Sequence, residues 1–199
     1  MALLKHLHTV GKHRRYVRSM CFKMGIPWQG LVHDLSKYSI KELSIAKYYT
    51  GTKSPHAACR ELKGYSPSWM HHYHKNKHHW QFWLDIEDWP NNVVPVKMPY
   101  KYVIESFCDM VGASKAYNPK SWNESMPWDY YEQKCAGNRL MHKESEYLLA
   151  KLLWNLKIHG QKKFIKWYKG AKKYLKENYI NGSLEFNDNE TSIYFEIRA

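Results

Sequence analysis

Two short stretches of the sequence carry residue types that bind metal ions. In the first, "WQGLVHDLSK", His33 and Asp34 stand side by side among apolar residues that predict a buried helical segment. An unpaired carboxylate is costly to bury, so an adjacent His and Asp in this setting imply a partner that compensates for the cost. A metal ion is the leading candidate for that partner.

The second stretch is "HHYHKNKHH", which holds five of the twelve histidines of the chain. On a helix, His71 and His78 would share one face about two turns apart, and so would His72 and His79. Imidazole nitrogens and carboxylate oxygens together suit Mn, Fe, Co, Ni or Zn, so the run predicts a site for a divalent transition metal ion. For the run alone, a solvated or base-stacking patch of histidines is the alternative.

Two more polar residues interrupt apolar helical patterns elsewhere in the chain. His13 lies one turn from Val10 and Val17, and Asp109 lies close to Phe107 within "KYVIESFCDMVGASK". Considered by itself, His13 would be interpreted as a hydrogen-bonded histidine of the core. Considered by itself, Asp109 would be interpreted as a helix cap or as the ion-pair partner of a lysine. Together with the His-Asp pair, they predict a shared polar site inside the protein.

The apolar periodicity and the capping residues place these side chains on helices. We expect helices over residues 2–24, 28–35, 39–50, 54–63, 66–84, 99–117, 142–159 and 161–178, and one further helical turn over 128–133. Ser39 and Glu42 have the spacing of a capping box, and Ser66 is a second expected N-cap. Prolines and asparagines in "DWPNNVVPVKMP" predict a loop.

The expected fold is an all-α bundle with a small β-hairpin near the C-terminus. Alternation around "NDNE" predicts that hairpin, which would lie in a tail over residues 181–199. Residues 1–180 would form one helical domain. The lysine-rich segment 161–178 is interpreted as an amphipathic helix that docks on the bundle, and less well as a helix that follows a phosphate backbone.

The charge and the cysteines limit the partners and the compartment. A net charge of +13 favours anionic partners, either a small phosphorylated molecule such as a nucleotide or a nucleic acid on the basic surface. The sequence has neither an apolar run of about 20 residues nor a secretory signal, so no membrane association is expected. The four cysteines are scattered singly, which predicts reduced thiols in a cytoplasmic protein.

The order of these residues resembles the HD superfamily of metal-dependent phosphohydrolases. "HDLSK" is similar to the superfamily's HD-[IL]-[GS]-K core, and the distance of twenty residues from His13 to His33 is in its usual range. The fuller pattern, over residues 5–155, also resembles a group of small uncharacterised bacterial and phage proteins related to that superfamily. The resemblance implies an HD-type helical bundle with ligands on several helices.

The resemblance also implies roles for individual residues. A first divalent ion would be bound by His13, His33, Asp34 and Asp109, and a second ion by residues chosen from His71, His72, His78 and His79. These four histidines lie closer together in the sequence than the corresponding histidines of HD-superfamily members that bind two metal ions. Binding of substrate phosphate is an alternative role for some of them. Asp34 would also orient or deprotonate the attacking water, and Lys37 and Lys115 would hold phosphate oxygens.

The function expected from this resemblance is hydrolysis of a phosphomonoester or phosphodiester in a nucleotide or a related small anion. The attacking water would be activated by the metal ion. One alternative is a non-catalytic nucleic-acid-binding protein with a structural metal site. Another is an HD-type oxygenase with a mixed-valent di-iron site.

Overall fold

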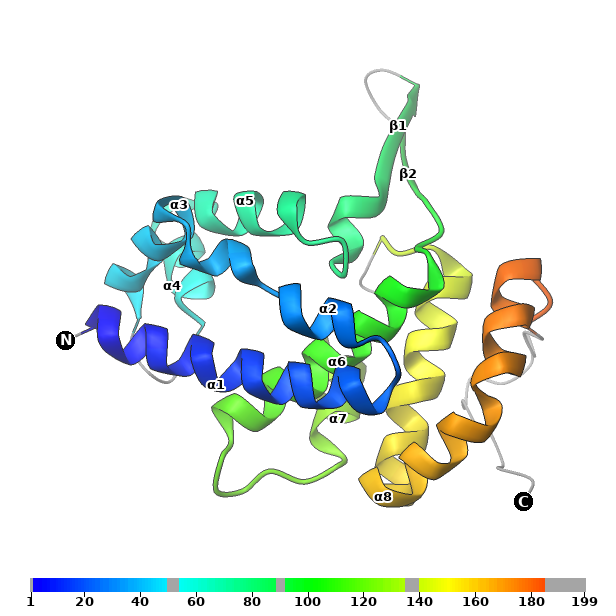
Figure 1. Cartoon of the computed structure of the whole chain (residues 1–199). Coiled ribbons are helices and arrows are strands. Elements are labelled where there is room, and N and C mark those ends of the chain that lie inside the picture. The colour runs from blue at the N-terminus through cyan, green and yellow to red at the C-terminus, as the bar shows by residue number, and fades with distance from the viewer. Residues whose placement is uncertain (1, 50–53, 89–91, 135–139, 185–199) are drawn as a thin grey trace.

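The structure is a computed structural model in which residues 2–49, 54–88, 92–134 and 140–184 are described. Within these ranges the fold is all-α, as the sequence predicts, with one small β-hairpin (Figure 1). The α-helices are α1 (Ala2–Lys23), α2 (Pro27–Val32), α3 (Ile40–Leu43), α4 (Pro55–Lys63), α5 (Pro67–Lys75), α6 (Tyr100–Tyr117), α7 (Met126–Lys134) and α8 (Lys143–Asn181). Short 3-10 helices are η1 (Leu35–Tyr38), η2 (Ser44–Tyr48) and η3 (Trp80–Trp83), and the strands are β1 (Leu84–Asp88) and β2 (Asn92–Pro95).

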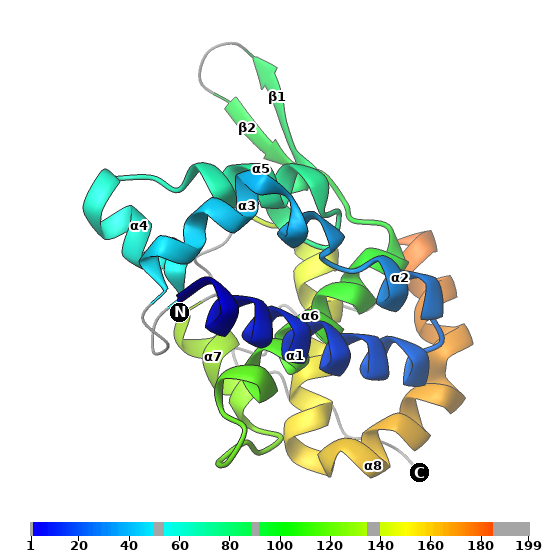
Figure 2. The ribbon, with the colours of Figure 1, turned by 60° about the vertical axis from the view of Figure 1, so that its left-hand side comes forward.

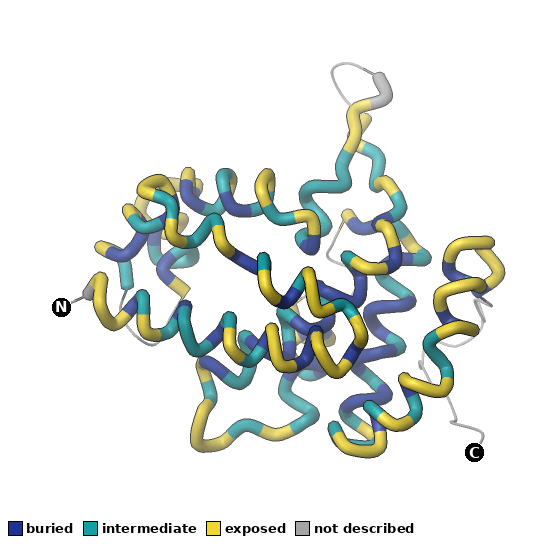
Figure 3. The backbone as a smooth tube through the Cα atoms, in the orientation of Figure 1, coloured by how far each residue is buried: buried dark blue, intermediate teal, exposed yellow. Residues whose placement is uncertain are grey.

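The core lies where α1, α6 and α8 meet (Figures 2 and 3). Val17, Phe107 and Leu152 are fully buried there. A Cβ atom on Gly112 would come within 2.4 Å of the Val17 side chain, so the glycine lets α1 and α6 approach closely. This close packing fixes the two long helices that carry His13 and Asp109.

The C-terminal helix α8 bends at Gly160, which has a φ of 68° and a ψ of 160°. Its lysine-rich second half buries Phe164, Tyr168 and Leu175 against the bundle and leaves most of its lysines exposed. This arrangement confirms the amphipathic docking helix predicted from the sequence. Within the described ranges, no helix combines the length and the apolar character needed to cross a membrane.

The hairpin is in a different place from the one that the sequence predicts. Strands β1 and β2 pair antiparallel, with Leu84 opposite Pro95 and Ile86 opposite Val93. The loop interpretation of "DWPNNVVPVKMP" was therefore wrong in part, because β-branched valines follow the turn-forming asparagines and favour a strand. The predicted C-terminal hairpin lies outside the described residues.

Two predicted helices end earlier than expected, and a third, expected over 39–50, is α-helical only to Leu43 and continues as the 3-10 helix η2. The helix expected over 66–84 ends at Lys75, because Asn76 adopts an extended conformation and donates from its side chain to the His72 carbonyl oxygen at 2.7 Å. The helix expected over 28–35 ends at Val32, and Leu35, expected to be buried, is about half exposed. Both interruptions lie beside residues that could bind a metal ion.

Candidate metal centre

The His-Asp pair lies in a tight turn between α2 and η1. Asp34 has a φ of 54° and is the one non-glycine residue with a positive φ among the described residues. Aspartate tolerates this left-handed conformation better than most side chains do, at a cost of roughly 1–3 kcal/mol. The guanidinium of Arg14 supports the turn by donating to the carbonyl oxygens of His33, at 2.8 Å, and Leu31, at 3.1 Å. The turn buries the side chains of both His33 and Asp34.

A first group of donor atoms brings together four residues that are distant in the sequence. Its members are His13 from α1, His33 and Asp34 from the turn, and Asp109 from α6. The Nε2 atom of His13 lies 3.2 Å from Asp34 Oδ2, 3.1 Å from Asp109 Oδ1 and 3.3 Å from the Nε2 atom of His33. His33 Nε2 lies 3.3 Å from the same two carboxylate oxygens. The four residues that the resemblance implies for a first ion therefore converge on one point.

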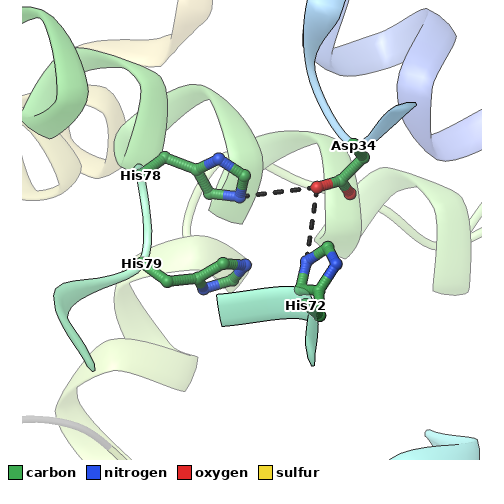
Figure 4. A group of neighbouring side chains, drawn as sticks. All are labelled: Asp34, His72, His78 and His79. Atoms are coloured by element: carbon green, nitrogen blue, oxygen red, sulfur yellow. Dashed lines mark ion pairs between the residues drawn. The ribbon is translucent and has the colours of Figure 1, made fainter. Parts of the chain in front are cut away.

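A second group consists of His72, His78 and His79 around the other oxygen of Asp34 (Figure 4). Asp34 Oδ1 lies 3.3 Å from His72 Nε2 and 3.6 Å from His78 Nε2. Asp34 Oδ1 and the Nε2 atoms of His78 and His79 are buried without a hydrogen-bond partner. Buried polar atoms are normally paired, so these three are donor atoms suited to binding an ion.

Two buried carboxylates support the imidazole rings from outside the two groups. Glu105 Oε1 accepts from His33 Nδ1 at 3.0 Å and from His78 Nδ1 at 3.2 Å. Glu42 Oε2 accepts from His72 Nδ1 at 2.8 Å. With Nδ1 protonated, each ring directs its Nε2 lone pair toward the donor groups, as metal-binding histidines do. His33, His78 and Glu105 are also close enough to form a third metal-binding group, but both Nε2 atoms already face the first two.

The charges of the centre favour ionised carboxylates. Burial alone would raise the pKa of Asp34, but the charges of His33 and Lys37 hold it well below its usual range. Hydrogen bonds from His13 and His33 likewise outweigh burial and lower the pKa of Asp109. Burial opposes a charge on His33, but Asp34 and the neighbouring carboxylates raise its pKa well above its usual value.

The second group differs, because two of its histidines, His72 and His79, favour the neutral form. Burial lowers the pKa of His72, and burial together with the neighbouring His78 and His72 lowers the pKa of His79. Neutral imidazole is the form that binds a metal ion.

One edge of the centre is open to solvent. The side chain of Asp109 is 21% exposed and that of Lys37 is 22% exposed, whereas those of His33 and Asp34 are fully buried. His79 is also partly exposed. The side of the centre that faces solvent is therefore the side of Asp109 and Lys37.

The chain was compared with known families and proteins. The model of a family of unknown function, DUF5662, matches residues 2–155. The chain belongs to this family. No curated protein and no solved structure matches the chain. The DUF5662 match includes every residue of both donor groups, together with Glu42 and Glu105, and ends within α8.

Two residues predicted for the site lie outside the donor groups. His71 Nδ1 contacts Glu42 Oε1 at 2.8 Å, so the ring pairs with a carboxylate rather than facing Asp34. Lys115 donates to Gln161 Oε1 at 2.6 Å and lies over the Trp122 ring. It follows Asp109 by six residues, which places it about 240° around the helix. The structure therefore places neither side chain in a donor group, because positions along one helix point in different directions.

Lys37 lies at the centre, where it forms an ion pair with Asp34 Oδ2, and its role in holding phosphate oxygens stays a prediction. His72 and His79 do belong to one group, but not through a shared helix face, because α5 ends at Lys75 and the chain turns back.

Sequence reasoning missed the roles of Glu42 and Glu105. Ser39 caps α3 as predicted, by accepting from the Glu42 amide at 3.3 Å, but the Glu42 side chain turns to the histidines instead of completing the capping box. For Glu105, the available signal was its position one turn before Asp109, which places both acids near one face of the helix.

Proposed function

We propose that this protein is an HD-type, metal-dependent phosphohydrolase that acts on a nucleotide or a related small phosphate ester. The observation that carries the proposal is the pair of donor groups that share Asp34 and open to solvent at Asp109. The order of the ligands along the chain also resembles the HD superfamily. The charge of +13 favours an anionic substrate.

The donor groups fit divalent transition metal ions such as Mn, Fe, Co, Ni or Zn. Atoms bound at about 2.0–2.2 Å to one ion lie about 3.0–3.4 Å apart, and the first group has separations of 3.1–3.3 Å. In the second group, Asp34 Oδ1 and the Nε2 atoms of His78 and His79 are one oxygen and two nitrogen donors of the kind that these ions bind. We therefore propose two ions, with Asp34 contributing one oxygen to each.

In the proposed reaction, the protein positions the substrate and stabilises charge. A divalent ion bound here would lower the pKa of a water molecule toward about 7 and polarise a phosphoryl oxygen. Asp34 is held ionised and could orient the attacking water, while Glu105 fixes the orientation of two ligand imidazoles. Lys37 lies at the open edge, where its charge would stabilise the negative charge that develops on the phosphoryl group. Buried free thiols at Cys21, Cys59 and Cys108 favour a reducing compartment, so we infer a cytoplasmic protein.

Elemental analysis and a substrate panel test this proposal. Purified protein should contain one or two transition metal ions, and it should hydrolyse nucleotides or bis-p-nitrophenyl phosphate when Mn, Co, Ni or Mg is added. Asp34→Ala should lose both metal and turnover. Lys37→Met should keep its metal and lose about 10²-fold in turnover, because a charge at the open edge is removed.

Lys115→Met is the matched control, because this lysine contacts Gln161 and Trp122, lies in neither donor group and should leave turnover unchanged. Protein that neither contains nor takes up metal would overturn the proposal. If such protein also bound DNA with a steep salt dependence, the non-catalytic nucleic-acid-binding alternative would replace it.

A further inference from the structure

We infer that Glu105 is a positioning residue that couples the two ion positions, so that an ion at one position raises the affinity of the other. The inference rests on the proposed two-ion centre. Glu105 Oε1 accepts one hydrogen bond from His33, a member of the first group, and one from His78, a member of the second. Glu105 is 5% exposed, so water competes little for these bonds.

The two hydrogen bonds link the orientation of the His33 ring to the orientation of the His78 ring. An imidazole bound to a cation at Nε2 is a stronger donor at Nδ1, so an ion beside His33 strengthens the bond to Glu105. The carboxylate is then held in the orientation that also accepts from His78 and keeps that ring in the tautomer the second ion needs. Because coupling of binding equilibria is reciprocal, the second ion must favour the first by the same factor.

The charge of the centre supports loading of both ions. Two divalent ions that share Asp34 repel each other, and the repulsion opposes coupling. Four carboxylates surround the two positions: Asp34, Asp109, Glu42 and Glu105. Their four negative charges, less the one positive charge of Lys37, offset most of the charge of two divalent ions, and Glu105 is the carboxylate that contacts histidines of both groups. Removing its charge should therefore weaken both positions.

Glu42 provides a matched control within the same centre. It is also a buried carboxylate with two histidine partners, but these are His72, from the second group, and His71, which belongs to neither group. Glu42→Gln and Glu105→Gln thus remove the same charge from similar surroundings. Only the second substitution interrupts a connection between the two groups.

Metal titration of the apoprotein tests the inference without any substrate. Mn²⁺ would be added in steps, with calorimetry to measure affinity and electron paramagnetic resonance to distinguish single ions from spin-coupled pairs. In the wild type, coupled pairs should appear below one equivalent. Glu105→Gln should lower the affinity for Mn²⁺ at both positions about 10- to 100-fold. In this variant, the two positions should fill separately. Glu42→Gln should weaken one position and still form pairs early.

Two outcomes would overturn the inference: single ions filling first in the wild type, or the same pattern in Glu105→Gln and Glu42→Gln. Circular dichroism would verify folding, and if Glu105→Gln does not fold, the wild-type titration alone decides. Absence of any metal binding would overturn the proposed function, whereas two ions that bind independently would overturn only the coupling.

Discussion

At the scale of single residues, the centre concentrates unfavourable features on Asp34. Its backbone is in the left-handed region, and its carboxylate is fully buried with one oxygen unpaired. Each feature costs free energy, and such costs are typical of functional sites, where the surrounding structure imposes them. The ion pair between Lys37 and Oδ2 offsets part of the cost, and Oδ1 is the oxygen without a hydrogen bond.

His56 provides a prediction at the same scale, outside the donor groups. Burial and the charges of Lys37 and His72 lower its pKa to about 3, so it stays neutral in the folded protein while the unfolded chain takes up a proton below about pH 6.5. The stability it contributes is therefore present above that pH and is lost as the pH falls. Since the side chain is partly exposed, we expect a loss of at most about 2 kcal/mol between pH 7 and pH 5.

Urea unfolding of His56→Asn at both pH values measures this effect. The variant should lose less stability on acidification than the wild type does, because the new side chain does not titrate. His74→Asn, at an exposed position of α5, is the control and should keep the wild-type difference. Equal losses in His56→Asn and the wild type would contradict the prediction.

The sequence was sufficient to predict the first donor group but not the two glutamates that hydrogen-bond to the histidines of the centre. His13, His33, Asp34 and Asp109 could be identified because a short motif and polar interruptions of apolar helices mark them. The choice of His78 and His79 over His71 depends on where α5 ends, and a pattern of residue types does not give that point. Glu42 and Glu105 were missed because the direction of a buried side chain depends on its tertiary neighbours.

At the scale of elements, α8 provides a test of a conformation that only glycine readily adopts. Gly160 has a φ of 68° and a ψ of 160°, and a Cβ atom there would meet nothing within 4 Å. The cost of Gly160→Ala is therefore conformational, and we expect it to lower the free energy of unfolding by about 1–3 kcal/mol. Gly170→Ala, in the same helix and also free of contacts, should instead add up to about 1 kcal/mol.

Urea unfolding of the two α8 variants gives the comparison directly. The free energy of unfolding should fall in Gly160→Ala and rise in Gly170→Ala. This difference in sign distinguishes a position that requires a bend from the general effect of replacing a glycine in a helix. If Gly160→Ala were as stable as the wild type, the bend would not be needed to dock the second half of α8.

The elements were predictable where local chemistry decides them. Ser39 and Ser66 cap their helices as predicted, and Gly160 separates the two parts of α8. The break after Lys75 was not predicted, because no glycine or proline follows it up to residue 84. There, the side chain of Asn76 satisfies the His72 carbonyl and also donates to Ser36 Oγ on η1. Tertiary contacts of this kind override helix propensity.

At the scale of the whole molecule, the donor groups connect segments that are distant along the chain. They draw on α1, the turn before η1, the end of α5 with the residues that follow it, and α6. Asp34 Oδ1 and the Nε2 atoms of His78 and His79 are buried without a hydrogen-bond partner, so a bound ion would add contacts between these segments. Metal binding should therefore stabilise the entire helical domain rather than one local segment.

Chelation should lower the melting temperature of the whole protein. A ligand that binds only the folded state at 100 to 1,000 times its Kd contributes about 3–4 kcal/mol, and each kcal/mol corresponds to about 2–4 °C for a protein of this size. Differential scanning calorimetry should thus show a single transition that falls by about 6–16 °C on chelation and recovers when Mn or Zn is restored. Asp34→Ala, which removes a ligand from both groups, should melt at the same temperature with and without chelator. A wild-type transition unchanged by chelation would mean that the convergence of these side chains does not bind metal, because an ion held by four segments must stabilise their association.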